Sequence, residues 1–145
     1  MLTALALAVP LVVAASLAVR VRRRYLVVDV RGPSMMPTFR DGDRVLVKRV
    51  PGDRVRAGQV VVLTGPELPA GVRARAPHAP PLGLLVKRVT AVRGEAVPGY
   101  VTGAPPRVPA GSLVVLSDNP AAGVDSRTVG LFSTEGVAGV VLRRL

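Results

Sequence analysis

The chain has 145 residues, of which 49% are hydrophobic and 3% are aromatic, and its formal net charge is +11. This length is enough for one compact domain. Cysteine is absent, which excludes disulfides, thiol catalysis and cysteine-bound zinc. The basic residues are scattered singly through apolar runs with few aromatic residues among them, and this pattern argues against a nucleic-acid partner.

The first segment of the chain is apolar and ends in a basic cluster. Residues 2–19 carry no charge, and as a helix of about 1.5 Å per residue they would nearly match the roughly 30 Å hydrocarbon core of a membrane. Basic residues directly after such a segment usually contact lipid headgroups, and here they are Arg20, Arg22, Arg23 and Arg24. We therefore predict a single transmembrane helix with a basic flank over residues 1–24. A cleaved signal peptide is the alternative, although no basic segment precedes the apolar run.

From Tyr25 onward, short runs of Val and Leu alternate with turn residues, which is the pattern of β-strands. The turns place Gly beside acidic residues, as in Asp41-Gly42-Asp43 and Arg93-Gly94-Glu95. We predict a mostly β domain over residues 25–145, with strands at Tyr25–Val30, Arg44–Val50, Gln59–Thr64, Leu84–Val92, Leu113–Ser117 and Val137–Leu142.

One long segment interrupts this pattern. Residues 66–81 are rich in Pro, Ala and Gly and contain the only histidine, His78, so we expect a surface loop. A lone histidine in such a loop is a poor candidate for a catalytic base, and no second histidine or cysteine exists to complete a metal site.

The two lysines are candidate bases. The chain contains 18 Arg but only Lys48 and Lys87 as lysines. Arginine cannot lose its proton near neutral pH, whereas a desolvated lysine can become a neutral, proton-accepting amine. Both lysines lie in apolar runs, so burial could lower the pKa of either one. Their local environment alone does not choose between them.

Ser34 is the candidate nucleophile. It follows a predicted strand, and Gly32, Pro33 and Pro37 constrain the backbone around it. A serine hydroxyl becomes a good nucleophile when a nearby base takes its proton and when preorganised donors stabilise the developing oxyanion. An ordinary serine in a proline-rich turn is the alternative interpretation.

Three motifs then match, in order, those of a known family. They are the serine segment Gly32–Thr38 followed by Gly42–Val47, the lysine segment Leu85–Val89, and a closing segment made of Ser117–Asn119, Asp125–Arg127 and Gly130. In these motifs the chain resembles the type I signal peptidases, the serine-lysine enzymes that remove leader peptides from exported proteins. The ordered set covers most of the chain after Tyr25.

The resemblance implies roles for the residues of the first two motifs. Ser34 matches the nucleophile and Lys87 the base, whereas Lys48 matches an ordinary strand position. The N–H of Ser34 would donate to the oxyanion, and Gly32 and Met35 would belong to the oxyanion site and its wall. Gly32 matches a position at which the family sometimes carries a second, hydroxyl donor, and glycine cannot supply it.

The closing motif is expected to build the wall of the site. In the family, the residues matching Asp125 and Arg127 form an ion pair that braces this wall, and Asp118 and Asn119 would shape the adjacent turn.

The chain departs from the family at two positions of this motif. The position matching Gly123 often carries a serine whose hydroxyl orients the lysine, and the position matching Ser117 is usually glycine. Ser117 or Ser126 could orient Lys87 instead.

The resemblance implies a β body of the signal-peptidase type in a compact form, and an enzyme that needs no metal or cofactor. Its partners would be membrane lipid and precursor proteins with small residues before the cut. We expect a single-pass protein of the cell membrane with an extracytoplasmic catalytic domain, although the arginines after the helix would favour the opposite side. The alternatives are a maturation protease dedicated to one partner and a catalytically silent membrane-anchored β-module that binds extended peptides.

Overall fold

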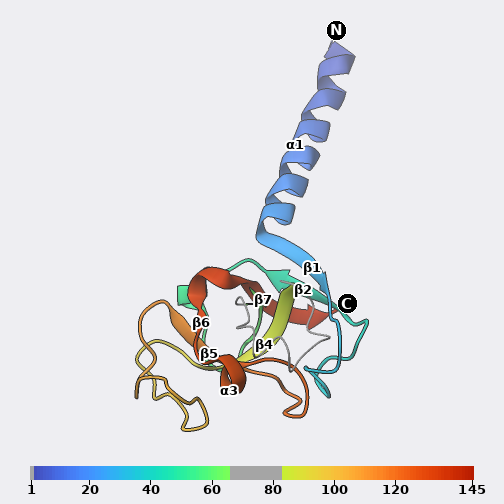
Figure 1. Cartoon of the computed structure of the whole chain (residues 1–145). Helices are drawn as coiled ribbons and strands as arrows, with labels where there is room; N and C mark the ends of the chain where they lie inside the picture. The colour runs from blue at the N-terminus through green and yellow to red at the C-terminus, as the bar shows by residue number, and fades with distance from the viewer. Residues whose placement is uncertain (1, 66–82) are drawn as a thin grey trace.

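The first element is a long helix that projects from a β body (Figure 1). The computed structural model describes residues 2–65 and 83–145, with side chains from residue 12 onward. Helix α1 covers Leu2–Arg24 and leads directly into the first strand. Within this described part, no helix combines the length and the apolar character needed to cross a membrane. The helix is therefore confirmed, but its role as a transmembrane span is unsupported by the structure.

Within residues 2–65 and 83–145, the body is built on one antiparallel sheet of seven strands in the order β1-β2-β7-β3-β4-β5-β6. The last strand along the chain, β7, lies between β2 and β3 and joins the N-terminal part of the sheet to the rest. The strands are β1 Tyr25–Asp29, β2 Arg44–Lys48, β3 Val60–Thr64, β4 Leu84–Ala91, β5 Ser112–Leu116, β6 Phe132–Ser133 and β7 Val137–Arg144. The described connections include the short helical turns η1 Gly52–Arg54, α3 Ser126–Val129 and η2 Thr134–Gly136.

The sheet buries apolar side chains on both faces, which explains the unbroken Val-Val-Val-Leu run of β3. Val60 and Val62 join a first cluster, and Val61 and Leu63 join a second. The first cluster also contains Val28, Val30, Met35, Phe39, Val45, Val47 and Val86. The second also contains Val55, Val89, Leu113, Val115, Phe132 and Val140. Register shifts in the β2–β7, β3–β7 and β4–β5 pairs help the sheet to curl around these cores.

The mostly β prediction is confirmed, and all six predicted strands are present with their ends shifted by one or two residues. The sequence pattern missed β6 and α3, which have only two and four residues and therefore show no periodicity. The predicted loop over residues 66–81, including His78, lies outside the described residues.

Gly139 of β7 is expected to be essential for stability. A Cβ atom at this position would lie 2.3 Å from the carbonyl oxygen of Lys48 and 2.9 Å from a side-chain carbon of Val47. Because the closer atom belongs to the backbone of the paired strand, it cannot move without distorting the sheet. Gly139→Ala should therefore lower the free energy of unfolding by about 2 kcal/mol or more, measured by denaturant titration. Gly99→Ala is the control, since its Cβ would meet no atom within 4 Å; equal stability of the two variants would contradict the prediction.

Candidate active site

The segment that carries Ser34 is a loop closed by its own backbone. The N–H of Val30 donates to the carbonyl of Asp43 at 2.8 Å, and the N–H of Gly42 donates back to the carbonyl of Val30 at 2.9 Å. The N–H of Gly32 is bound to the carboxylate of Asp41 at 2.7 Å. Gly32 therefore has neither a side chain nor a free N–H with which to bind an oxyanion.

Met35 fixes this loop to the body, because its side chain is fully buried in the first core cluster. It is an anchor beneath the serine rather than an exposed part of the wall. The N–H of Ser34 makes no hydrogen bond with any acceptor in the described residues. This N–H therefore has no acceptor within the described residues, which leaves it available for the oxyanion role that the resemblance implies.

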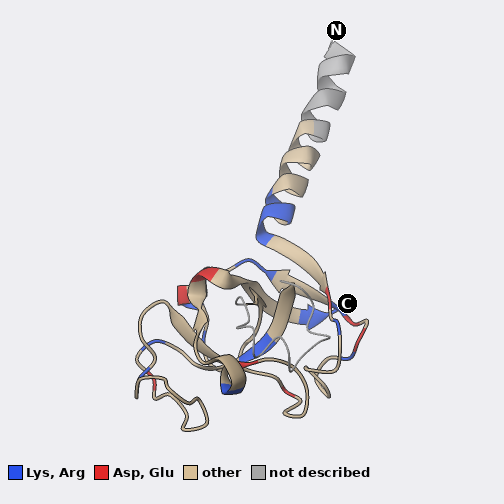
Figure 2. Ribbon diagram, viewed as in Figure 1, with Lys and Arg blue, Asp and Glu red and all other residues tan. Residues whose placement is uncertain are grey.

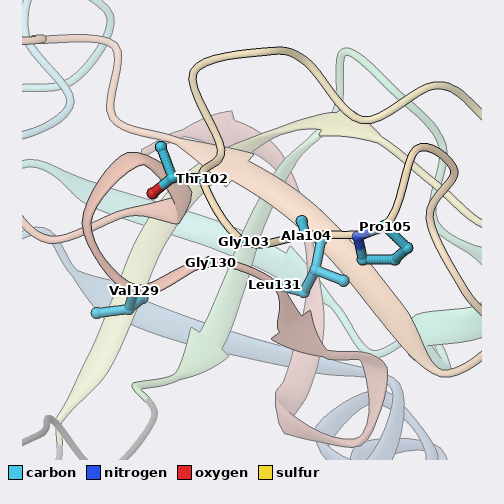
Figure 3. A pocket seen from close by; sticks show the side chains of 7 residues that line it. All are labelled: Thr102, Gly103, Ala104, Pro105, Val129, Gly130 and Leu131. Carbon is cyan, nitrogen blue, oxygen red and sulfur yellow. The ribbon is translucent and has the colours of Figure 1, made fainter.

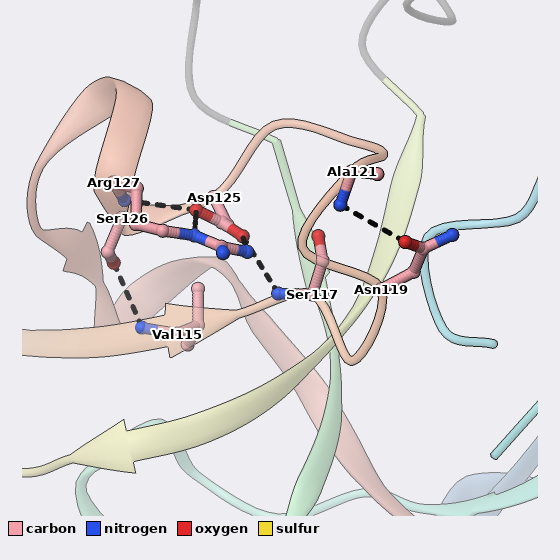
Figure 4. A network of polar contacts seen from close by, with 7 residues as sticks. All are labelled: Val115, Ser117, Asn119, Ala121, Asp125, Ser126 and Arg127. Atoms are coloured by element: carbon pink, nitrogen blue, oxygen red, sulfur yellow. Dashed lines mark hydrogen bonds and ion pairs between the residues drawn. The ribbon is translucent and has the colours of Figure 1, made fainter. Parts of the chain in front are cut away.

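Asn119 holds the closing motif against the serine loop. Its N–H donates to the carbonyl of Ser34 at 2.9 Å, and its side-chain amide donates to the carbonyl of Pro33 at 3.2 Å. The side-chain oxygen of Asn119 accepts from the N–H of Ala121 at 3.1 Å, which tightens the turn that follows (Figure 4). Asn119 thus couples two motifs that lie 85 positions apart.

Lys87 lies in β4 opposite Val61 of β3 and is only 2% exposed. Burial lowers the pKa of the Lys87 amine from its ordinary value of 10.5 to about 8; Asp125 opposes this change and the cation of Arg127 assists it. A useful fraction of the amine is then neutral at mildly alkaline pH. Lys48, by contrast, is exposed at the end of β2, so burial separates two lysines that the local sequence pattern does not.

Gly123 marks the point at which the candidate catalytic side chains converge. A Cβ atom at Gly123 would lie 2.8 Å from the Cβ of Ser34, 3.0 Å from the Oγ of Ser117 and 3.1 Å from the Nζ of Lys87. The Cβ of Ser34 and the Nζ of Lys87 therefore lie close together, because they cannot be farther apart than these two distances added together. The side chains of the first two motifs meet here, with the turn of the third motif beside them.

Asp125 organises the wall behind this point. Its carboxylate accepts from the N–H of Ser117 at 2.9 Å and from the N–H and side chain of Arg127 (Figure 4). Burial alone would raise the pKa of Asp125, but the hydrogen bonds from Arg127 and Ser117 outweigh it and lower the pKa below its usual value. The predicted ion pair is present, and the carboxylate also caps the N-terminus of α3.

Asp118 belongs to a second clamp, which the sequence analysis missed in part. Both oxygens of its carboxylate accept from Arg88, at 2.8 and 2.7 Å, and one also accepts from the hydroxyl of Thr38 at 2.5 Å. The hydrogen bonds from Arg88 lower the pKa of Asp118. Arg88 also donates to the carbonyl of Gly58 at 2.9 Å. Through Asp118 and Thr38, the bidentate pair joins Arg88 of the lysine segment to the closing segment and to the serine segment. The only sequence signal for this role of Arg88 is its position next to Lys87.

A surface hollow of about 300 Å³ lies where the end of α3 meets the loop after residue 100 (Figure 3). It is lined by Thr102, Gly103, Ala104, Pro105, Val129, Gly130 and Leu131. None of the residues predicted to act in catalysis lines it, so the candidate site is defined by the side chains around Gly123.

The site thus places a serine near a buried lysine amine on an antiparallel sheet. The comparison with known families is more specific: residues 2–103 match the family described as signal peptidase, peptidase S26. Because the match spans more than half of the chain, the protein belongs to this family. The closing motif lies beyond the matched residues and reaches the site through the contacts of Asp118 and Asn119. No curated protein matches the chain.

Proposed function

We propose that this member of the signal peptidase family is a membrane-anchored endopeptidase that removes leader peptides through a dyad of Ser34 and Lys87. The family assignment supports the signal-peptidase type of activity on precursor proteins. The observation that carries the dyad is the approach of Ser34 and the buried Lys87 amine to the same point beside Gly123.

In the proposed reaction, the Oγ of Ser34 attacks the carbonyl carbon of the scissile bond as the neutral Nζ of Lys87 takes its proton. The negative charge on the carbonyl oxygen faces the N–H of Ser34. Lys87 then gives the proton to the leaving amine, and an acyl-enzyme remains on Ser34. Water, activated by the same neutral amine, releases the leader peptide and restores the hydroxyl.

The anchor is the second part of the proposal. The last turns of α1 are basic and face the β body (Figure 2). A hollow of about 510 Å³ at the junction with β1 is lined by Leu17, Arg20, Val21, Arg23, Arg24 and Tyr25. This mixture of apolar stems and cations suits the headgroup region of a membrane. An enzyme held there would meet the junction between leader and mature protein on the extracytoplasmic side, where exported precursors emerge.

A catalytically silent peptide-binding module and a protease dedicated to one partner are the alternatives. The silent module would not require a lysine with a lowered pKa, so the burial of Lys87 favours an enzyme. The dedicated protease would use the same dyad and differ only in its substrate.

The pH dependence of cleavage tests the proposed base. Only the neutral form of Lys87 accepts a proton, so kcat/KM on a leader peptide with alanines before the cut should rise with pH and level off above an apparent pKa of about 8. The measurement is a pH–rate profile of the purified full chain in lipid or detergent. A rising limb near the ordinary histidine value of about 6.5 that disappears in His78→Ala would show that another base acts.

A further inference from the structure

Ser117 carries a buried hydroxyl that the described fold leaves without a hydrogen-bond partner. The residue follows β5 directly and is 6% exposed. Its N–H donates to Asp125, but its Oγ finds no partner among the described residues. An unsatisfied buried hydroxyl costs stability, so its presence calls for an explanation other than folding.

The hydroxyl faces the same space as the candidate base. A Cβ atom at Gly123 would lie 3.0 Å from the Oγ of Ser117 and 3.1 Å from the Nζ of Lys87. In Figure 4 the hydroxyl of Ser117 points into the turn between Ser117 and Asp125, away from the hydrogen bonds of the Asp125 carboxylate. A hydroxyl and a buried amine thus border the same small space.

The other nearby serine does not have this freedom. The Oγ of Ser126 accepts from the N–H of Val115 at 2.9 Å, and its side chain is 1% exposed. Ser126 therefore serves the connection between α3 and β5. Of the two serines that the sequence offers for orienting the base, the contacts favour Ser117.

We propose that Ser117 is a positioning residue whose hydroxyl, unpartnered in this structure, hydrogen-bonds the nearby Nζ of Lys87 during catalysis and directs it toward Ser34. The proposal rests on the Ser34–Lys87 dyad of the proposed function. It assigns to the closing motif a direct part in aligning the base, in addition to the bracing by Asp125.

Gly123 is the structural condition for this arrangement. Its φ of +91° is a conformation that residues with side chains rarely adopt. A Cβ there would come within 2.8 Å of the Cβ of Ser34 and would occupy the space that the Ser117 hydroxyl and the amine share. A side chain at residue 123 and a hydroxyl at residue 117 therefore compete for one volume, and this chain has the hydroxyl at residue 117.

The test compares Ser117→Ala with the matched variant Ser126→Ala. Ser117→Ala should lower kcat about tenfold with little change in KM, which is the effect of losing one hydrogen bond of ordinary strength. It should also move the rising limb of the pH–rate profile to lower pH, because the lost oxygen stabilises the ammonium form. At pH 10, where the folded-state amine of Lys87 is neutral in both proteins, its Tm should stay equal to that of the wild type or rise. Ser126→Ala should instead lower Tm and leave the rising limb of the pH–rate profile in place.

A direct titration makes the result independent of turnover. The chain has only two lysines, so labelling lysine at Cε with ¹³C gives two NMR signals, and the exposed Lys48 serves as the internal reference. The Lys87 signal should titrate at lower pH in Ser117→Ala than in the wild type. An unchanged titration and an unchanged kcat in a folded Ser117→Ala variant would overturn the proposal. If instead the wild type has no rising limb and Lys87→Arg is active, the dyad itself is wrong.

Discussion

Ser34→Ala should abolish cleavage of a leader peptide while leaving the protein folded. Without the hydroxyl no acyl-enzyme can form, and a nucleophile that acts together with its base commonly accounts for a factor of about 10⁴ or more in kcat. The exchange removes one oxygen atom from a loop that is held by backbone bonds and by the buried Met35. Stability should therefore change by less than about 0.5 kcal/mol.

Two measurements check this expectation on the full-length protein. A peptide-cleavage assay followed by mass spectrometry gives the residual activity, and thermal unfolding shows whether the variant is folded. Met36→Ala is a suitable control, because Met36 lies in the same loop with an exposed side chain and should keep most of the activity. A folded Ser34→Ala protein that retains more than a few per cent of wild-type activity would remove Ser34 from the mechanism.

The motifs single out Ser34 and Lys87 as candidates, but local pattern alone cannot separate Lys87 from Lys48. Both lysines follow runs of Val and Leu. The difference arises from the fold, because Lys48 ends β2 at the surface, whereas Lys87 is buried in β4 between β3 and β5 with its amine beside Gly123 of the closing segment. That segment is some 30 residues farther along the chain, and no local window contains both.

The clamp of Asp118 shows a similar limit. The turn chemistry of Asp118-Asn119-Pro120 predicts a turn, but not that its carboxylate would be shared by Arg88 and Thr38. Those three residues come from three motifs, and only strand pairing brings them together. By contrast, short runs of Val and Leu between turn residues are enough to predict six strands. The apolar residues that a strand buries lie within the strand itself, so a local window contains the whole signal.

The consequence of burying Lys87 can be measured as stability as well as activity. With a pKa of about 8 in the folded protein against about 10.5 when unfolded, the ammonium form is destabilised by burial. Below pH 8 both states are protonated, so the full cost of the buried charge is present. Between pH 8 and 10.5 only the unfolded state holds the proton, and stability rises with pH.

Lys87→Met should therefore give an inactive protein that is more stable than the wild type at pH 7. The gain should be on the order of 3 kcal/mol in the free energy of unfolding, and it should shrink as the pH approaches 10.5.

Lys87→Arg should be equally inactive, because arginine stays protonated, whereas Lys48→Arg should cleave like the wild type. Denaturant titrations at pH 7 and pH 10 together with the peptide assay test both parts. An active Lys87→Arg enzyme would exclude Lys87 as the base. If Lys87→Met were less stable than the wild type at pH 7, the buried amine would be held by favourable contacts and not destabilised by burial.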